Sequence, residues 1–190
     1  MLSNVRRLWG GTEIDGSIDG GGSASGSDNP NTRSLVSCQP LSGLFEVVEQ
    51  RGLDPELLIV DTGRTVDYLR DRRNRVPWED FRLVVEQLAY HYDEDEIVAI
   101  GRQLVNTAAQ RPFGLIARRF FSIGDFYRAV FSQKSGWGKP MFPCMTSTCI
   151  QLATDVFEVT LELHEGFVPS PVFVMITEGN IIGIPEVLGG

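Results

Sequence analysis

The sequence predicts an α+β protein in which a helical amino-terminal half precedes a helix–β-hairpin–helix half. From residue 35 to about residue 131, apolar residues recur at the three- and four-residue spacing of amphipathic helices. The segment VFEVTLELH, which begins at Val156, instead alternates apolar and polar residues as a strand does. The run SPVFVMITEGNIIG then favours a closing helix opened by Ser170 and Pro171, although its β-branched residues leave a strand open.

Residues 1–34 are expected to form a flexible leader. Residues 11–34 are rich in Gly, Ser and Asp and contain almost nothing to bury, so they cannot offset the entropy lost on ordering. A few apolar residues near the start could form one helical turn that docks on another surface, with a plain tether as the alternative: Leu2, Val5, Leu8 and Trp9. Beyond the leader we expect a helical subdomain over 35–111 and an α+β subdomain over 112–190.

The first predicted helices are short and carry their own start and stop signals. The segment PLSGLFEVVEQRG ends at Gly52 and places four apolar residues on one face: Leu41, Leu44, Phe45 and Val48. The segment LDPELLIVDTG starts with Asp54 as N-cap and Pro55 in the first helical position, and Gly63 ends it. The segment TVDYLRDRR predicts one more short amphipathic helix.

The stretch RVPWEDF, residues 75–81, predicts the start of a core helix. The fixed φ of Pro77 suits the first turn, and the charges of Glu79 and Asp80 are favoured there by the helix dipole. The helix is expected to run to about Tyr92 with a broad apolar face formed by Trp78, Phe81, Val84, Val85, Leu88 and Ala89. We therefore expect Trp78 to be buried although its neighbours are charged.

The remaining segments complete the predicted order. DEDEIVAIGRQLVNTAAQ predicts a helix with acidic residues at its start. RPFGLIARRFFS and IGDFYRAVFSQKSG predict two more helices, the second capped by Ser122. CMTSTCIQL and VFEVTLELH, joined at Ala153–Asp155, then predict a β-hairpin.

Composition and charge exclude several classes of protein. The chain has 190 residues, 42% of them hydrophobic and 22% charged, which is typical of a soluble globular protein. A net charge of -8 argues against binding nucleic acid or an anionic membrane through bulk electrostatics. Three cysteines do not make a disulfide framework, and the residues after Arg7 lack the apolar core of a signal peptide. We therefore expect a cytoplasmic protein with free thiols.

The run from Arg51 to Gly101 carries a recognisable arrangement of core and turn residues: Gly52, Leu53, Asp54, Leu57, Leu69, Val76, Pro77 and Phe81. With these residues the chain resembles the amino-terminal input domain of AraC-type transcription regulators, and related modules ahead of kinase or cyclase outputs in bacterial signalling proteins. The segment FFSIGDFYRAVF fits the helix that precedes the hairpin in that group, and the similarity extends over residues 35–188. The resemblance implies sensing and, often, dimerisation. No helix-turn-helix segment follows the input half, so the output would lie in a further domain or another protein.

No catalytic, cofactor or metal motif is apparent. No Ser/His/Asp or Cys/His arrangement can be argued, and DGGGSASGSD lacks the ending of a phosphate-binding loop. Cys144 and Cys149 are five residues apart on a predicted strand, hence on opposite faces and unable to chelate together. His91 and His164 are the only histidines, and a haem sensor is an alternative although the Tyr-x-Ser-x-Arg run of that family is absent. We expect core thiols, with a redox-responsive thiol as the alternative.

Two segments supply candidate binding residues. The loop GWGKP carries Trp137 between glycines, so this side chain either covers a pocket or partner surface or fills the core. Arg118 and Arg119 lie among aromatic residues that include Phe121, an arrangement suited to an anion. A third segment mixes arginines with aspartates and predicts an ion-paired surface, with an anionic ligand or partner as the alternative: Arg64, Arg70, Arg72, Arg73 and Arg75 with Asp61, Asp67 and Asp71.

The leading hypothesis is a non-enzymatic sensory or regulatory input domain of a bacterial signalling protein. It would bind a small ligand or a partner between its two halves and pass the change to an output domain or partner signalling protein. The alternative is an adaptor or assembly protein that acts through protein–protein contacts without a small ligand. In both cases we expect a homodimer that uses no cofactor or metal.

Overall fold

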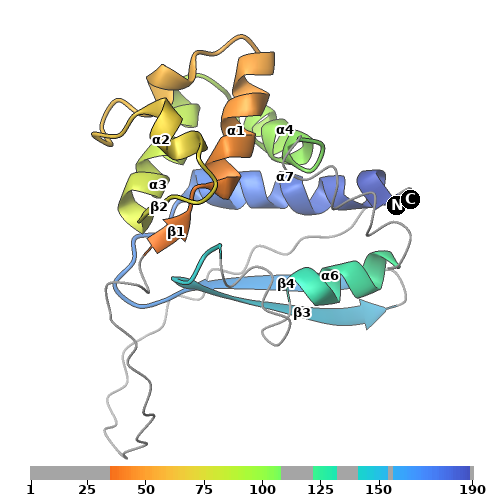
Figure 1. The fold of residues 1–190 in the computed structure, drawn as a ribbon. Helices are drawn as coiled ribbons and strands as arrows, with labels where there is room; N and C mark the ends of the chain where they lie inside the picture. Colours follow the sequence, from red (N-terminus) through yellow and green to blue (C-terminus); the bar gives the residue numbers. More distant parts are fainter. Residues whose placement is uncertain (1–34, 108–121, 132–140, 154–155, 189–190) are drawn as a thin grey trace, which may run out of the picture.

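The computed structural model describes residues 35–107, 122–131, 141–153 and 156–188 (Figure 1). The predicted α+β class is confirmed, because helices and two small antiparallel sheets make up the described chain. The elements are β1 (Leu35–Ser37), α1 (Gln39–Gln50), η1 (Pro55–Leu58), α2 (Val66–Arg70), β2 (Arg75–Pro77), α3 (Trp78–Glu86), η2 (Gln87–Tyr90), α4 (Glu94–Leu104), α6 (Ile123–Phe131), β3 (Met145–Ala153), β4 (Val156–Leu163) and α7 (Pro171–Leu188), where η marks a 3₁₀ turn. The predicted leader, and all of the predicted helix RPFGLIARRFFS except Ser122, lie outside the described residues.

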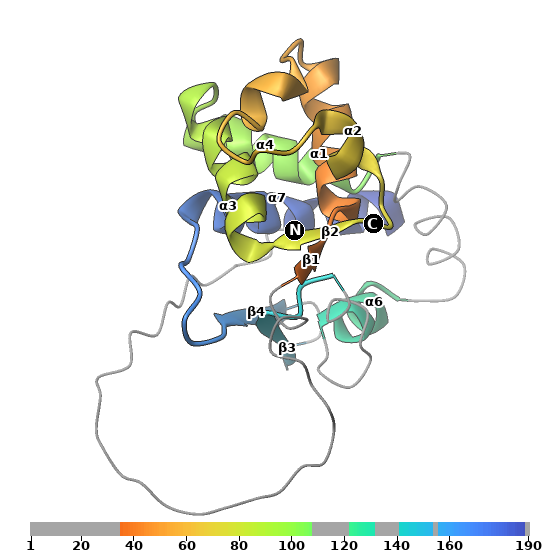
Figure 2. The same cartoon turned by 60° about the vertical axis from the view of Figure 1, so that its left-hand side comes forward.

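Helix α7 lies between two groups of elements. Helices α1 to α4 gather on one side of it, and the β3–β4 hairpin with α6 lies on the other, as both views show (Figures 1 and 2). Among the described residues, α7 is the one helix long and apolar enough to cross a membrane by length and composition. Here it packs along α4 instead, and seven of its residues are buried. The open choice between helix and strand for this segment is therefore settled as helix.

The strands β1 and β2 were not predicted, since a helix was expected from Leu35 onward. They pair antiparallel with Val36 opposite Val76, and both valines are fully buried. Pro77 is the last residue of β2, with φ -53° and ψ 149°, so helix α3 begins one residue later, at Trp78. A proline favours an extended backbone at the residue before it, which is Val76 here, so a strand that ends at Pro77 agrees with this preference.

The predicted helix signals are largely confirmed. The Asp54 carboxylate accepts the Glu56 amide at 3.0 Å, and Gly52 has a left-handed φ of 83° where α1 ends. The Ser122 hydroxyl accepts the Asp125 amide at 3.1 Å at the start of α6. The Ser170 hydroxyl likewise accepts the Phe173 amide at 3.2 Å at the start of α7. These caps fix where the helices begin.

The main core lies between α1, α3, α4 and the first half of α7. The predicted apolar face of α1 is fully buried, and the indole of Trp78 is 1% exposed, as expected. Ala89 was expected on the same face but is exposed. The α-helix gives way at Gln87 to the tighter 3₁₀ turn η2, which rotates Ala89 away from the core.

The predicted hairpin is confirmed. Strands β3 and β4 pair antiparallel, with Ser147 opposite Leu161 and Cys149 opposite Val159, and the register shifts between Gln151 and Ala153. Cys149 and Val159 pack against a second apolar cluster at the other end of α7. One face of the hairpin therefore covers part of the protein core, as strand alternation predicts.

Candidate functional site

Trp137, Arg118, Arg119 and Phe121 all lie outside the described residues, so the binding site that they would form stays a prediction. In the described part of the chain, both apolar clusters include residues of α7: the first half of the helix belongs to the main core and the second half to the second cluster. We therefore take the surroundings of α7 as the candidate site.

An aromatic group surrounds the first turn of α7. The rings of Trp78 and Phe81 stack at 5.7 Å between centroids, and Phe173 meets the Trp78 ring edge-on at 5.4 Å. The indole Nε1 of Trp78 donates to the Val168 carbonyl oxygen at 2.8 Å. This bond joins the start of α3 to the segment that leads into α7, across 90 positions of sequence. Because the indole N–H has this hydrogen-bond partner, the Trp78 side chain can be buried without leaving a polar group unpaired.

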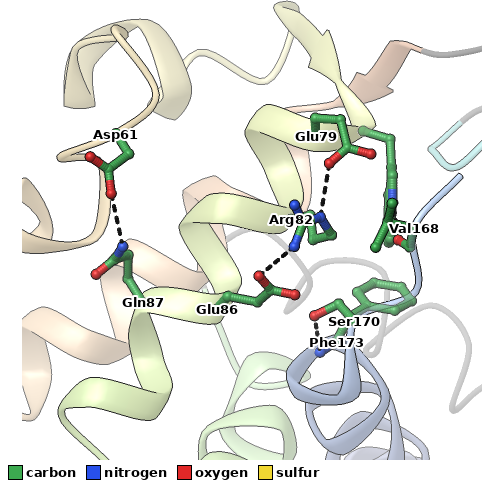
Figure 3. Close-up of polar contacts among 9 residues, drawn as sticks. Asp61, Glu79, Arg82, Glu86, Gln87, Val168, Ser170 and Phe173 are labelled. Carbon is green, nitrogen blue, oxygen red and sulfur yellow. Dashed lines mark hydrogen bonds and ion pairs between the residues drawn. The ribbon is translucent and has the colours of Figure 1, made fainter.

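The outer face of α3 holds a compact ion-pair network (Figure 3). Arg82 lies between two carboxylates, with its Nε 2.9 Å from Glu79 and its Nη1 2.6 Å from Glu86. The hydrogen bond to Glu79 raises the pKa of Arg82, so this side chain is charged at any physiological pH. At the start of η2, Gln87 donates to Asp61 at 3.5 Å and joins η2 to the turn that follows η1. Both ion pairs of Arg82 lie within α3 and therefore support the helix itself.

Helices α4 and α7 contact each other backbone to backbone. A Cβ added at Gly179 would lie 2.8 Å from the Arg102 amide nitrogen, and one at Gly183 would lie 2.7 Å from the Arg102 carbonyl oxygen. A Cβ at Gly101 of α4 would overlap the backbone of Ile176. Real Cβ atoms do not come within 3.0 Å of other heavy atoms, so only glycine fits at these positions. Arg102 also forms an ion pair with Glu186 across the same contact.

The far end of α7 belongs to the second cluster, which also includes Val105, directly after α4, and residues of α6 and the hairpin. Its buried members are Val105, Phe126, Tyr127, Ile181 and Ile184. The Tyr127 ring lies 5.6 Å from that of Phe157 on β4. Its hydroxyl donates to the Ile181 carbonyl oxygen at 2.7 Å. This buried bond joins α6 to the interior of α7.

The described thiols are poor nucleophiles. Burial raises the pKa of Cys38 and of Cys144 to about 11, and burial also raises the pKa of Cys149. A thiolate is the reactive form, so all three are held in the unreactive state at neutral pH. Cys38 and Cys144 are fully buried, as expected for core thiols.

The histidines and the arginine–aspartate segment lie at the surface, where several of their side chains form hydrogen bonds and ion pairs. No group of three or more His, Cys, Asp or Glu within the described ranges could hold a metal ion. Both histidines are exposed, and His164 shares a hydrogen bond of 2.9 Å with Thr146. The mixed arginine–aspartate segment forms ion pairs, for example Arg73 with Asp71 at 2.7 Å, which lowers the pKa of Asp71 to about 2. An ion-paired surface is thus what this segment supplies.

Two features of the candidate site were missed from the sequence. The spacing Gly179-x-x-x-Gly183 is typical of helices that approach closely through small residues, and this pattern could have been read in advance. The hydrogen bond from Tyr127 to the Ile181 carbonyl could not have been predicted, because 54 positions of sequence separate the two residues.

Comparisons with protein-family models, with curated proteins and with solved structures find no match for this chain. The resemblance to AraC-type input domains therefore stays a prediction, and the function must be inferred from the surroundings of α7.

Proposed function

We propose that this protein is a non-enzymatic sensory or regulatory input domain of a bacterial signalling protein, located in the cytoplasm. The observation that carries the proposal is that one helix, α7, belongs to both apolar clusters. Val172, Phe173 and Ile176 lie in the main core, whereas Ile181 and Ile184 lie in the second cluster. A change on the hairpin side of the molecule would therefore act on the same helix that completes the helical core.

The contact between α4 and α7 is suited to passing on such a change. Glycines bring the two backbones together, so little side-chain flexibility remains to absorb a shift of α7. A ligand or partner that binds one arrangement of α6 and the hairpin more tightly than another would bias the position of α7. Helix α4 and the aromatic group around Trp78 would then follow, and an output domain or partner would detect the difference.

The first test is a native mass spectrum of the purified protein, compared with its denatured mass. Extra mass that disappears on denaturation identifies a bound small molecule and supports the sensory role. The same sample, labelled with 5-fluorotryptophan, should show a shifted ¹⁹F resonance for Trp78 once the molecule is removed. A bare native mass would contradict small-ligand sensing, and an unshifted Trp78 resonance would contradict transmission through α7.

An adaptor role, without a small ligand, is the second candidate, and the tip of the hairpin favours it. Ile150, Leu152 and Val156 are 54%, 61% and 38% exposed there, which is unusual for three large apolar side chains so close in sequence. Such a tip would suit a protein–protein contact, including the expected homodimer. Leu152→Lys should lower the oligomer mass if the hairpin tip forms this contact, and an unchanged mass would contradict a contact through the tip. Deleting residues 1–34 separately tests whether the leader is a docking tail.

A further inference from the structure

Helix α7 contains a proline four residues after Ile181. In an α-helix the amide of residue 185 would donate to the carbonyl of residue 181, but Pro185 has no N–H. The Ile181 carbonyl oxygen is therefore left without its helical donor. It lies in the buried second cluster, where the hydroxyl of Tyr127 reaches it from α6 at 2.7 Å. A side chain of one element thus replaces a backbone bond of another.

The protonation of Tyr127 agrees with this arrangement. Burial raises the pKa of Tyr127 to about 12, so the hydroxyl keeps its proton and remains a donor. An unpaired carbonyl in an apolar cluster would be costly, because no water reaches it to replace the lost bond. Docking of α6 and the helical state of α7 around Pro185 therefore depend on each other.

Within the described part of the chain, fewer residues are buried in the second cluster than in the main core. Among the described residues, five are buried in it, and its other apolar members are only partly buried, including Phe131, Phe157, Val187 and Leu188. The main core buries residues from every element of the helical half. Regions with fewer buried contacts open at lower free energy than the molecule as a whole. Of the two described clusters, the one that contains Tyr127 is thus the better suited to open alone.

We infer that the bond from Tyr127 to Ile181 is a latch, which holds α6 against the second half of α7 in one state and releases it in another while the helical core stays folded. The inference deepens the proposed function, because it names the contact through which α7 is controlled. In the latched state the Ile181 carbonyl is paired and the apolar face of Ile181 and Ile184 is covered. In the released state water satisfies the carbonyl and that apolar face is uncovered.

Hydrogen exchange of the full-length protein tests the latch without any ligand. In the wild type, amides of α6 and of Glu186–Leu188 should exchange through an opening that leaves the amides of α1 and α3 protected. Tyr127→Phe should raise exchange of the first group about 5- to 150-fold, the range expected for losing a buried hydrogen bond. Amides of α1 and α3 should not change.

Tyr68→Phe is the matched control, since it removes another tyrosine–carbonyl bond, from Tyr68 to Arg75 at 3.2 Å, in the exposed part of the helical half. It should leave exchange of α6 unchanged. Equal protection of α6 and α1 in the wild type would overturn the inference, because the molecule would then open as one unit. An equal effect of Tyr127→Phe on all amides would overturn it for the same reason.

A double-mutant cycle tests the role of the proline directly. Pro185→Ala restores the amide that Ile181 lacks, so Tyr127→Phe should accelerate exchange of α6 much less in the Pro185→Ala background than in the wild type. Effects that simply multiply in the double mutant would overturn the latch. None of these measurements involves a ligand. The exchange data can therefore support the latch even if the mass spectrum contradicts small-ligand sensing, and they can contradict the latch even if the mass spectrum shows a ligand.

Discussion

Replacing Gly179 with Ala should destabilise the protein, although alanine is the better helix former. Gly179 lies at the point where α7 crosses α4, and an added Cβ would lie 2.8 Å from the Arg102 amide nitrogen and 2.9 Å from the Val98 carbonyl carbon. Both neighbours are backbone atoms of a helix that is itself packed in the core. Neither can move aside as a flexible side chain could.

The expected size of the effect follows from two opposing contributions. Alanine in place of glycine favours a helix by about 1 kcal/mol. Overpacking a core usually costs about 1–3 kcal/mol and costs more where the neighbours cannot yield. Moving α7 away by about 1 Å would also forfeit roughly half of the dispersion energy along the contact. We expect a net loss of at least about 2 kcal/mol.

Urea unfolding followed by circular dichroism at 222 nm measures this loss. With a denaturant dependence of about 2 kcal/mol per molar, the midpoint should fall by about 1 M or more. Gly43→Ala in α1 is the matched control, because its added Cβ would meet side-chain atoms of Thr107 at 3.3 Å and 3.7 Å and of Leu104 at 3.7 Å. Its stability should stay within about 1 kcal/mol of the wild type. A midpoint for Gly179→Ala equal to or above that of Gly43→Ala would refute a backbone-to-backbone contact between α4 and α7.

Three further predictions concern the helix cap, the thiols and the buried indole. Asp93→Ala removes the capping box of α4, in which the Asp93 carboxylate accepts the Glu96 amide at 2.9 Å, and should lower the free energy of unfolding by about 0.5–2 kcal/mol. Glu94→Ala is the control and should have a smaller effect. Equal effects of the two substitutions would contradict the cap. Cys38 and Cys144 have pKa values raised from 9.0 to about 11, so the unfolded chain loses these protons first, and stability should fall as pH rises from 9 to 11. The fall, followed by urea midpoints at constant ionic strength, should shrink in Cys144→Ala, and a flat profile would refute burial of these thiols. Trp78→Phe removes the indole bond to a backbone carbonyl and should cost about 1–3 kcal/mol in the same assay, so an unchanged midpoint would contradict that bond.

Local signals in the sequence predicted local structure well. Asp54, Ser122 and Ser170 cap the elements that they were expected to cap, and each bond spans only two or three residues. The burial of Trp78 was also predicted, since the spacing of its apolar neighbours marks one face of a single helix. Such features depend on the chemistry of a few adjacent residues, which the sequence displays directly.

Features that join distant segments were harder to predict. The pairing of β1 with β2 was missed because three-residue strands are too short to show alternation. Ala89 was placed on the wrong face because the sequence does not show where an α-helix tightens into a 3₁₀ turn. The partner of Tyr127 depends on how α6 and α7 are arranged in space, and no local pattern reports that arrangement. The candidate binding residues around Trp137 remain predictions.

The position of α7 also constrains the order of events during folding. The main core needs Val172, Phe173 and Ile176, yet most of its other residues come from the first half of the described chain. Contacts between segments so far apart in sequence form slowly, because a long loop must close before they contribute any stabilisation. On the ribosome, α1, α3 and α4 would be complete well before the helix that covers them, and their apolar faces would stay uncovered in the meantime. Newly made chains should therefore depend on chaperones until residues 171–188 have emerged.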